Sequence, residues 1–118
     1  MAGRVIAVVG ASGDRGKFGN RAVRAFLRQG YDVRPVNPNE EIIEGLPVYK
    51  TIGDIPGPVD IVSLYVPAAI GIGLLEAIAA KQPREVWINP GAESAALEAR
   101  ARTLGLSPIY ACSIVALG

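Results

Sequence analysis

Residues 5–20 read VIAVVGASGDRGKFGN, a short apolar run followed by a turn that is rich in glycine. The run Val5–Val9 is continuous and mostly β-branched, as expected for a strand that is buried on both faces. The glycines recur at intervals of three residues, at Gly10, Gly13, Gly16 and Gly19. Between a strand and a helix, such a turn lets the backbone approach a phosphate, and the free N–H groups of the helix start face the anion. The segment therefore predicts the phosphate-binding turn of a nucleotide-cofactor domain.

The same half of the chain carries an excess of positive charge. Residues 1–36 contain seven Lys or Arg and two Asp, a balance of +5, whereas the remainder has a balance of −4. The donors nearest the turn are Ser12, Arg15, Lys17 and Arg21. A field of this sign raises the local concentration of an anionic ligand. For Arg24 and Arg28 we favour a simpler interpretation, the solvent face of an amphipathic helix.

Short apolar runs alternate with helical stripes along the 118 residues. Strands are expected at Val5–Val9, Asp32–Val36, Ile61–Val66, Glu85–Ile88 and Pro108–Cys112. Helices are expected at Asn20–Gln29, with Asn20 as N-cap and Gly30 ending the helix, at Ala68–Ala80 and at Glu93–Leu104. A polar loop with a short turn at Thr51–Ile55 is expected after the second strand, and an apolar tail after the last. This order predicts one Rossmann-like α/β domain over residues 1–118, with a five-stranded parallel sheet and helices on both faces.

The loops that follow the strands are the expected ligand site, because ligands of such sheets bind beyond the carboxyl ends of the strands. Four loops, 10–19, 37–40, 66–69 and 89–92, would meet there. Three of them contain a strand-end dipeptide with proline: Asn37-Pro38, Val66-Pro67 and Asn89-Pro90. Proline is also a routine strand terminator. The expected position of all three dipeptides at one edge of the sheet nevertheless favours a ligand site there.

Two common nucleotide motifs are absent. An NAD site usually has G-x-G-x-x-G and an acidic residue at the end of the second strand. Here the turn begins Gly10-Ala11-Ser12-Gly13, and the first acid after the second strand is Glu40, beyond Pro38. A P-loop is absent too, because Lys17 is followed by Phe18. NAD and an ATPase mechanism are therefore disfavoured.

The composition excludes several classes of chemistry. The chain has no histidine, and Cys112 is its one cysteine, so a zinc site and a disulfide framework are not expected. No nucleophile has an evident base beside it, and we expect no enzymatic activity. Cys112 could face a ligand thiol, and Trp87 could stack on adenine, but core packing is favoured for both. No apolar run approaches the ~20 residues of a membrane span, no signal peptide is evident, and nucleic-acid binding has little support, so a cytoplasmic location is expected.

Four segments together resemble one family. The runs Val8–Ser12 and Lys17–Asn20 are similar to the opening loop of the CoA-binding Rossmann domains, which are related to the N-terminal domain of the succinyl-CoA synthetase alpha subunit and of ADP-forming acyl-CoA synthetases. Segments 30–38, 65–68 and 87–94 resemble the patterns around the family's second, third and fourth strands, the last as in small stand-alone members. The chain departs from the family at Tyr110-Ala111-Cys112, where many members have Asn-Arg-Cys. It also lacks the phosphohistidine and the further domains of the synthetases, so it cannot carry that ligase reaction alone.

The resemblance implies that the chain binds coenzyme A with the ADP portion across the strand ends. The residues around the phosphates would be Gly10, Ala11, Ser12, Lys17 and Gly19. Asn37 and Pro38 would lie against the adenosine, and Val66 and Pro67 along the adenine or pantetheine path. On charge grounds we add Arg15 and Arg21 as candidates for the 3′-phosphate, since an Arg–phosphate pair can be bidentate.

Three functional hypotheses follow. The first is a non-enzymatic binder of CoA or acyl-CoA that acts as a carrier, sensor or regulatory partner. The second is an interaction module in which helix 68–80, apolar nearly all round, forms a homo-oligomer or partner surface. The third, an NAD(P)-binding redox sensor, ranks lower because no nicotinamide partner is visible.

Overall fold

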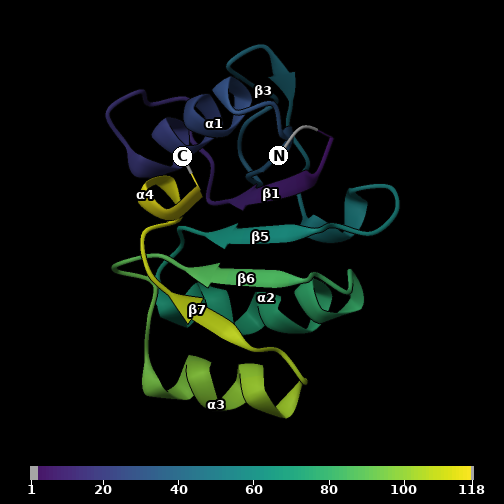
Figure 1. Cartoon of the computed structure of the whole chain (residues 1–118), viewed down its shortest axis with the longest axis vertical. Helices are drawn as coiled ribbons and strands as arrows, with labels where there is room; N and C mark the ends of the chain where they lie inside the picture. Colours follow the sequence, from purple (N-terminus) through teal and green to yellow (C-terminus); the bar gives the residue numbers. More distant parts are fainter. Residues whose placement is uncertain (1–2, 118) are drawn as a thin grey trace.

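The computed structural model describes residues 3–117 and shows an α/β domain with one parallel sheet (Figure 1). The sheet has the strand order β2-β1-β5-β6-β7. These strands are β1 (Val5–Val9), β2 (Asp32–Val36), β5 (Ile61–Leu64), β6 (Glu85–Ile88) and β7 (Pro108–Tyr110). The helices are α1 (Phe18–Arg28), α2 (Ala68–Ala80), α3 (Ala95–Thr103) and α4 (Ser113–Leu117), and a hairpin of β3 (Ile42–Ile43) and β4 (Leu46–Pro47) precedes the 3-10 turn η1 (Ile52–Asp54). The predicted Rossmann-like fold class is confirmed.

Helices cover both faces of the sheet because successive side chains of a buried strand point to opposite sides. Val9 lies in the core beneath α2 and α3, together with Leu75 and Leu97. Val8 lies in the core beneath α1, together with Phe26. Full burial of such a side chain contributes about 1.5–3 kcal/mol. The continuous apolar run of β1 is thus explained by its two covered faces.

The strand order places the topological switch point between β1 and β5. The chain leaves β1 through α1 to pair β2 on one side, then returns through η1 to pair β5 on the other side. Figure 1 shows the arrowheads of β1, β5 and β6 directed to the same edge of the sheet. The loops after β1, β2, β5 and β6 therefore meet at this edge, as predicted.

Helix α1 begins two residues earlier than predicted, and Asn20 is not its N-cap. Lys17 holds the N-cap position without a side-chain cap, and Asn20 lies fully buried within the helix. The helix can begin early because Gly19, in its first turn, has no Cβ to collide with the end of β1. The other end is as predicted, since Gly30 follows the C-cap with a φ of 86°.

Other boundaries also differ from the prediction. Helix α3 begins at Ala95 with Ser94 as its N-cap, and Glu93 lies outside the helix. Strands β5 and β7 end two residues before the predicted Val66 and Cys112, and the tail forms α4. The polar loop after β2 contains the hairpin β3–β4, which packs Ile43 into the core.

Helix α2 has the predicted bounds, and part of its apolar surface is buried in the core. Gly71, Leu75 and Ile78 are buried, and α2 packs beside α3. Ile70 is the one large apolar side chain of α2 that is clearly exposed, at 56%. Within residues 3–117, no helix has the length and apolarity needed to cross a bilayer.

Candidate functional site

The glycine-rich loop brings three backbone segments into close contact at the switch point. Gly10 has a φ of 92°, and a Cβ there would lie 3.0 Å from Val66 Cγ1. A Cβ on Gly19 would lie 2.2 Å from the carbonyl oxygen of Gly10. Gly16 is not constrained in this way, because its nearest neighbour would be 3.4 Å away. Gly10 and Gly19 thus form the close backbone approach that a phosphate cradle requires.

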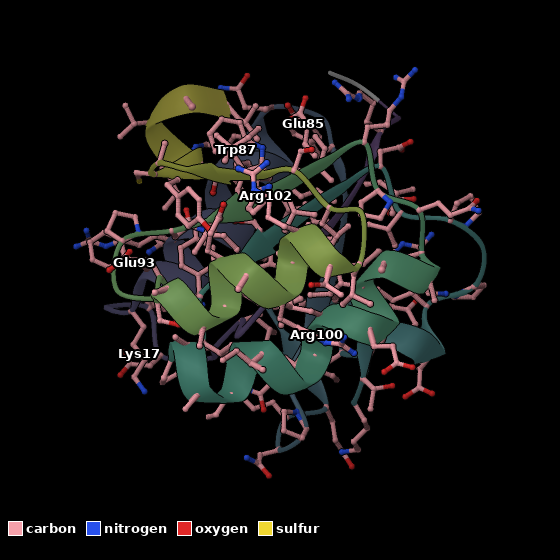
Figure 2. The ribbon with its side chains drawn as sticks, turned by 90° about the horizontal axis from the view of Figure 1, so that it is seen from below. Lys17, Glu85, Trp87, Glu93, Arg100 and Arg102 are labelled. Carbon is pink, nitrogen blue, oxygen red and sulfur yellow. The ribbon has the colours of Figure 1, made fainter. Side chains whose placement is uncertain are left out.

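The N-terminus of α1 lies in this loop. Its first turn has no acidic residue and its N-cap, Lys17, makes no side-chain cap. The first amides of a helix have no partner within the helix and carry partial positive charge. Figure 2 places Lys17 at the margin of the molecule where the strands end, the margin that Glu93 also occupies. This helix start can therefore bind an anion at the carboxyl edge of the sheet.

Asn20 and Arg24 hold the loop from within. Asn20 Nδ2 donates to the carbonyl oxygen of Ser12 at 2.9 Å. Arg24 Nε donates to Asn20 Oδ1 at 2.8 Å, and its Nη2 donates to the carbonyl oxygen of Arg15 at 2.9 Å. Arg28 is exposed, as expected for a solvent face, but Arg24 is half-buried and supports the loop.

Two carboxylates from the segment after β2 contact this loop. The Gly13 N–H donates to both oxygens of Glu40, at 2.8 and 3.1 Å. Glu44 accepts from Asn20 Nδ2 at 3.1 Å and forms an ion pair with Arg15 at 3.4 Å. The first acid after β2 therefore returns to the glycine turn, which sequence spacing did not indicate. Its carboxylate occupies an amide that a phosphate could also use.

A cleft of about 320 Å³ opens beside the loop at the carboxyl ends of β1 and β2. Four predicted binding residues line it: Gly10, Asn37, Pro38 and Val66. Asn37 is fixed there, because its Nδ2 donates to the carbonyl oxygen of Ala11 at 2.8 Å and its Oδ1 accepts from the Asn39 amide. The remaining walls are largely apolar and suit a planar base.

Sequence reasoning missed the wall that α2 and η1 contribute. Ile70, Leu74 and Ile78 come from α2, and Lys50 and Ile52 come from the segment around η1. The signal for the α2 residues was the apolar composition of residues 68–80. A wider depression of about 480 Å³ near Gly57 and Lys81 lies at the amino-terminal edge of the sheet, away from the loop.

The other predicted residues do not line the cleft. Pro67 is the N-cap residue of α2, and its carbonyl oxygen accepts from the Ile70 and Gly71 amides. Arg15 and Arg21 line a separate groove of about 450 Å³ between α1 and α4, together with Arg24 and Arg28. The arginines proposed for the 3′-phosphate therefore face the opposite flank of the loop from Asn37 and Pro38.

A smaller pocket of about 90 Å³ lies at the carboxyl ends of β5 and β6. Its walls are Phe18, Tyr65, Asn89, Pro90 and Cys112. Behind it, Asn89 Oδ1 accepts from the amide and the hydroxyl of Ser113, both at 2.9 Å. Asn89 Nδ2 donates to Ser63 Oγ and to the Leu64 carbonyl oxygen. This buried network fixes the first residue of α4 to the sheet.

Tyr65, Trp87 and Cys112 differ in their burial and in their hydrogen-bond partners. Burial raises the pKa of the Tyr65 hydroxyl above its usual value, although its hydrogen bonds with Ser113 and Ser63 act in the opposite direction. Tyr65 is therefore neutral at physiological pH. Trp87 is buried beneath α1 and donates to Glu85 at 2.9 Å, which supports packing rather than stacking (Figure 2). Cys112 is partly buried and lines the small pocket.

The chemistry available at this edge is binding through amides, cations and apolar walls. Within the described range 3–117, no group of three or more His, Cys, Asp or Glu could hold a metal ion. An elongated ligand with a planar base and phosphates fits the arrangement, because the cleft, the loop and the small pocket all lie at the carboxyl ends of the strands.

Comparisons with known proteins match the chain to one family and to several solved structures. A family described as "CoA binding domain" matches residues 4–118. The alpha subunit of an ADP-forming acetate–CoA ligase II from Pyrococcus furiosus is 43% identical over 65 residues, which are 54% of this chain and 14% of that protein. A conserved hypothetical protein from Pyrococcus furiosus has a TM-score of 0.88 and 33% identity over 96% of this chain and 98% of its own. A hypothetical protein from Pyrococcus horikoshii has a TM-score of 0.89 and 29% identity, covering 95% of this chain and 80% of its own.

Proposed function

The chain belongs to the CoA-binding domain family, and we propose that it binds coenzyme A or an acyl-CoA through its glycine-rich loop without catalysing a reaction. The observation that carries this proposal is the apolar cleft of about 320 Å³ directly beside the backbone cradle of Gly10 and Gly19. A base and a pyrophosphate need these two environments next to each other.

Different residues would bind the adenine and the phosphates of the ligand. Val66, Pro38 and Ile70 would hold the adenine in the cleft. The loop amides, the start of α1 and Lys17 would hold the phosphates. A phosphate at Gly13 would replace the Glu40 carboxylate, because one amide cannot serve both anions.

A ligand panel tests the proposal. Isothermal calorimetry and thermal shift would compare CoA, acetyl-CoA, NADH and ATP. A ligand at ~100 times its Kd adds about 2.7 kcal/mol to the free energy of unfolding. Lys17→Glu should weaken CoA binding by more than about 1 kcal/mol. Arg84→Glu, with the same charge change at the opposite edge of the sheet, should not. Stabilisation by NADH alone would overturn the proposal.

NADH belongs in the panel because Glu40 favours it as a second candidate. A carboxylate after the second strand of a dinucleotide fold can accept from ribose hydroxyls. Glu40 lies in that segment and reaches the loop. The oligomer hypothesis gains less support, since α2 clearly exposes one large apolar side chain, Ile70, and that side chain lines the cleft.

A further inference from the structure

We propose that the 90 Å³ pocket formed by Phe18, Tyr65, Asn89, Pro90 and Cys112 receives a short, uncharged acyl group carried on CoA. The inference rests on the proposed function and specifies it further. It assigns to this chain a preference for acetyl- or propionyl-CoA over free CoA and over long-chain acyl-CoA.

The position of the pocket supports this assignment. The larger cleft lies on the β1–β2 side of the loop, and the small pocket lies on the β5–β6 side. Consecutive residues after β5 contribute to both: Val66 lines the cleft on the α2 side of the sheet, and Tyr65 lines the pocket on the α1 side. A ligand of a doubly wound sheet crosses the switch point from one half to the other. An adenosine in the cleft therefore directs the far end of the ligand toward the pocket.

The volume of the pocket limits the size of the group. One water molecule has a share of about 30 Å³ in the liquid, so 90 Å³ holds roughly three such volumes. An acyl group of two or three carbons has this size, and a long chain does not.

The walls of the pocket limit the polarity of the group that it can bind. The Asn89 amide is saturated by Ser63, Ser113 and the Leu64 carbonyl oxygen. The Tyr65 hydroxyl bonds with Ser113 Oγ at 2.9 Å. The pocket thus offers mainly the rings of Phe18 and Pro90 and the face of Tyr65. A group ending in a carboxylate would lose its hydration there without gaining a partner.

The floor of the pocket resists expansion. Ser63, Asn89 and Ser113 are at most 1% exposed and bond to one another across β5, β6 and α4. Enlarging the pocket on this side would break several buried hydrogen bonds, each of which is costly to leave unmade. The sheet therefore sets the size limit at the floor, and the exposed ring of Phe18 sets it at the side that faces the groove between α1 and α4.

Calorimetric titration with a series of CoA esters tests the inference. Each methyl or methylene that becomes buried should tighten binding about three- to fourfold. Acetyl- and propionyl-CoA should therefore bind more tightly than CoA, whereas hexanoyl- and succinyl-CoA should gain nothing over CoA. Phe18→Ala removes an exposed wall and should extend the preference to hexanoyl-CoA. Val115→Ala, an exposed change on α4 outside the pocket, should leave the series unchanged.

The outcomes separate the two proposals. Equal affinity for CoA and all its esters would overturn the acyl inference and leave CoA binding intact. Tightest binding of hexanoyl-CoA by the unaltered chain would also overturn it. Binding of no CoA species would overturn the proposed function itself.

Discussion

At the scale of single residues, the Glu40 carboxylate occupies the Gly13 N–H group, which a bound phosphate would also use. Both of its oxygens accept from Gly13 N–H, and a Cβ on that glycine would lie 2.5 Å from Oε1. A phosphate must therefore displace a charge-assisted hydrogen bond before it can occupy this part of the loop. Under the proposed function, this hydrogen bond stabilises the free protein at the expense of its affinity for CoA.

Glu40→Gln should tighten CoA binding by about 1 kcal/mol, roughly fivefold, because the competing charge is removed. The same substitution should lower the stability of the free protein by about 1 kcal/mol. Calorimetry and urea unfolding measure the two effects. Glu41→Gln, the same charge change at an exposed neighbour, is the control. Weaker CoA binding by Glu40→Gln would show that Glu40 contacts the ligand instead.

Gly19 is a second residue with a defined constraint. Gly19→Ala places a methyl group 2.2 Å from the Gly10 carbonyl oxygen and should destabilise the fold by about 1–3 kcal/mol while weakening CoA binding. Gly16→Ala meets its nearest atom at 3.4 Å and should be nearly neutral. Thermal unfolding of the pair distinguishes them, and equal melting temperatures would contradict the close approach.

At the scale of elements, the edge strand β2 carries an ion pair on alternate residues. Arg34 donates to both oxygens of Asp32, at 2.9 and 3.0 Å, and to the Tyr49 hydroxyl at 2.8 Å. The hydrogen bond from Arg34 lowers the pKa of Asp32 below its usual value of 3.8, although burial acts in the opposite direction.

Because the folded-state pKa of Asp32 is lowered, the pair contributes stability above pH 3.8, and this contribution is lost as the pH falls through the folded-state value. The effect is small, since the Asp32 side chain is 42% exposed. The unfolding free energies of the unaltered chain and of Asp32→Asn should differ at neutral pH and converge as the pH falls below the folded-state pKa of Asp32. A difference that grows on acidification would contradict the assignment.

Helix α4 depends on one buried serine. Ser113 bonds to Asn89, Ser63 and Tyr65, and it is fully buried. Ser113→Ala should cost about 1–3 kcal/mol because buried partners lose their hydrogen bonds. Amide exchange should show that α4 is the element most affected. Ser107→Ala, at an exposed position, should cost less than about 0.5 kcal/mol.

At the scale of the whole molecule, the charge is divided between the two parts of the chain. The balance of +5 over residues 1–36 includes the arginines of α1 and the loop, and the remainder has a balance of −4. Of these cations, Arg15 and Lys17 belong to the loop and Arg21 to the start of α1, next to the proposed phosphate site. This distribution attracts an anionic ligand even though the net charge is only +1.

Salt should therefore weaken CoA binding. Charges more than about 10 Å apart are largely screened at 0.1 M salt, so affinity should fall severalfold as salt is raised through this range. Arg21→Glu, at the start of α1, should flatten this dependence, and Arg84→Glu, near the amino-terminal edge, should not. Affinity that is independent of salt would contradict electrostatic attraction.

The positions of several elements could be read from local sequence. The bounds of β1, β2, α2 and β6 were predicted, because an apolar run or stripe and a terminator such as Gly10 or Pro38 act over only a few residues. The order of these elements then fixed a parallel sheet, and the parallel sheet fixed the edge at which Gly10, Asn37 and Val66 meet.

Contacts between residues that are distant in the sequence could not be predicted and are seen only in the tertiary structure. Glu40 bonds to Gly13 across 27 residues, and Asn89 bonds to Ser113 across 24. Local pattern carries no information on such pairs, because a loop can be closed in many ways at similar entropic cost and packing selects among them. The internal carboxylate on the phosphate loop, the α2 wall of the cleft and the small pocket beside Tyr65 all arise at this level.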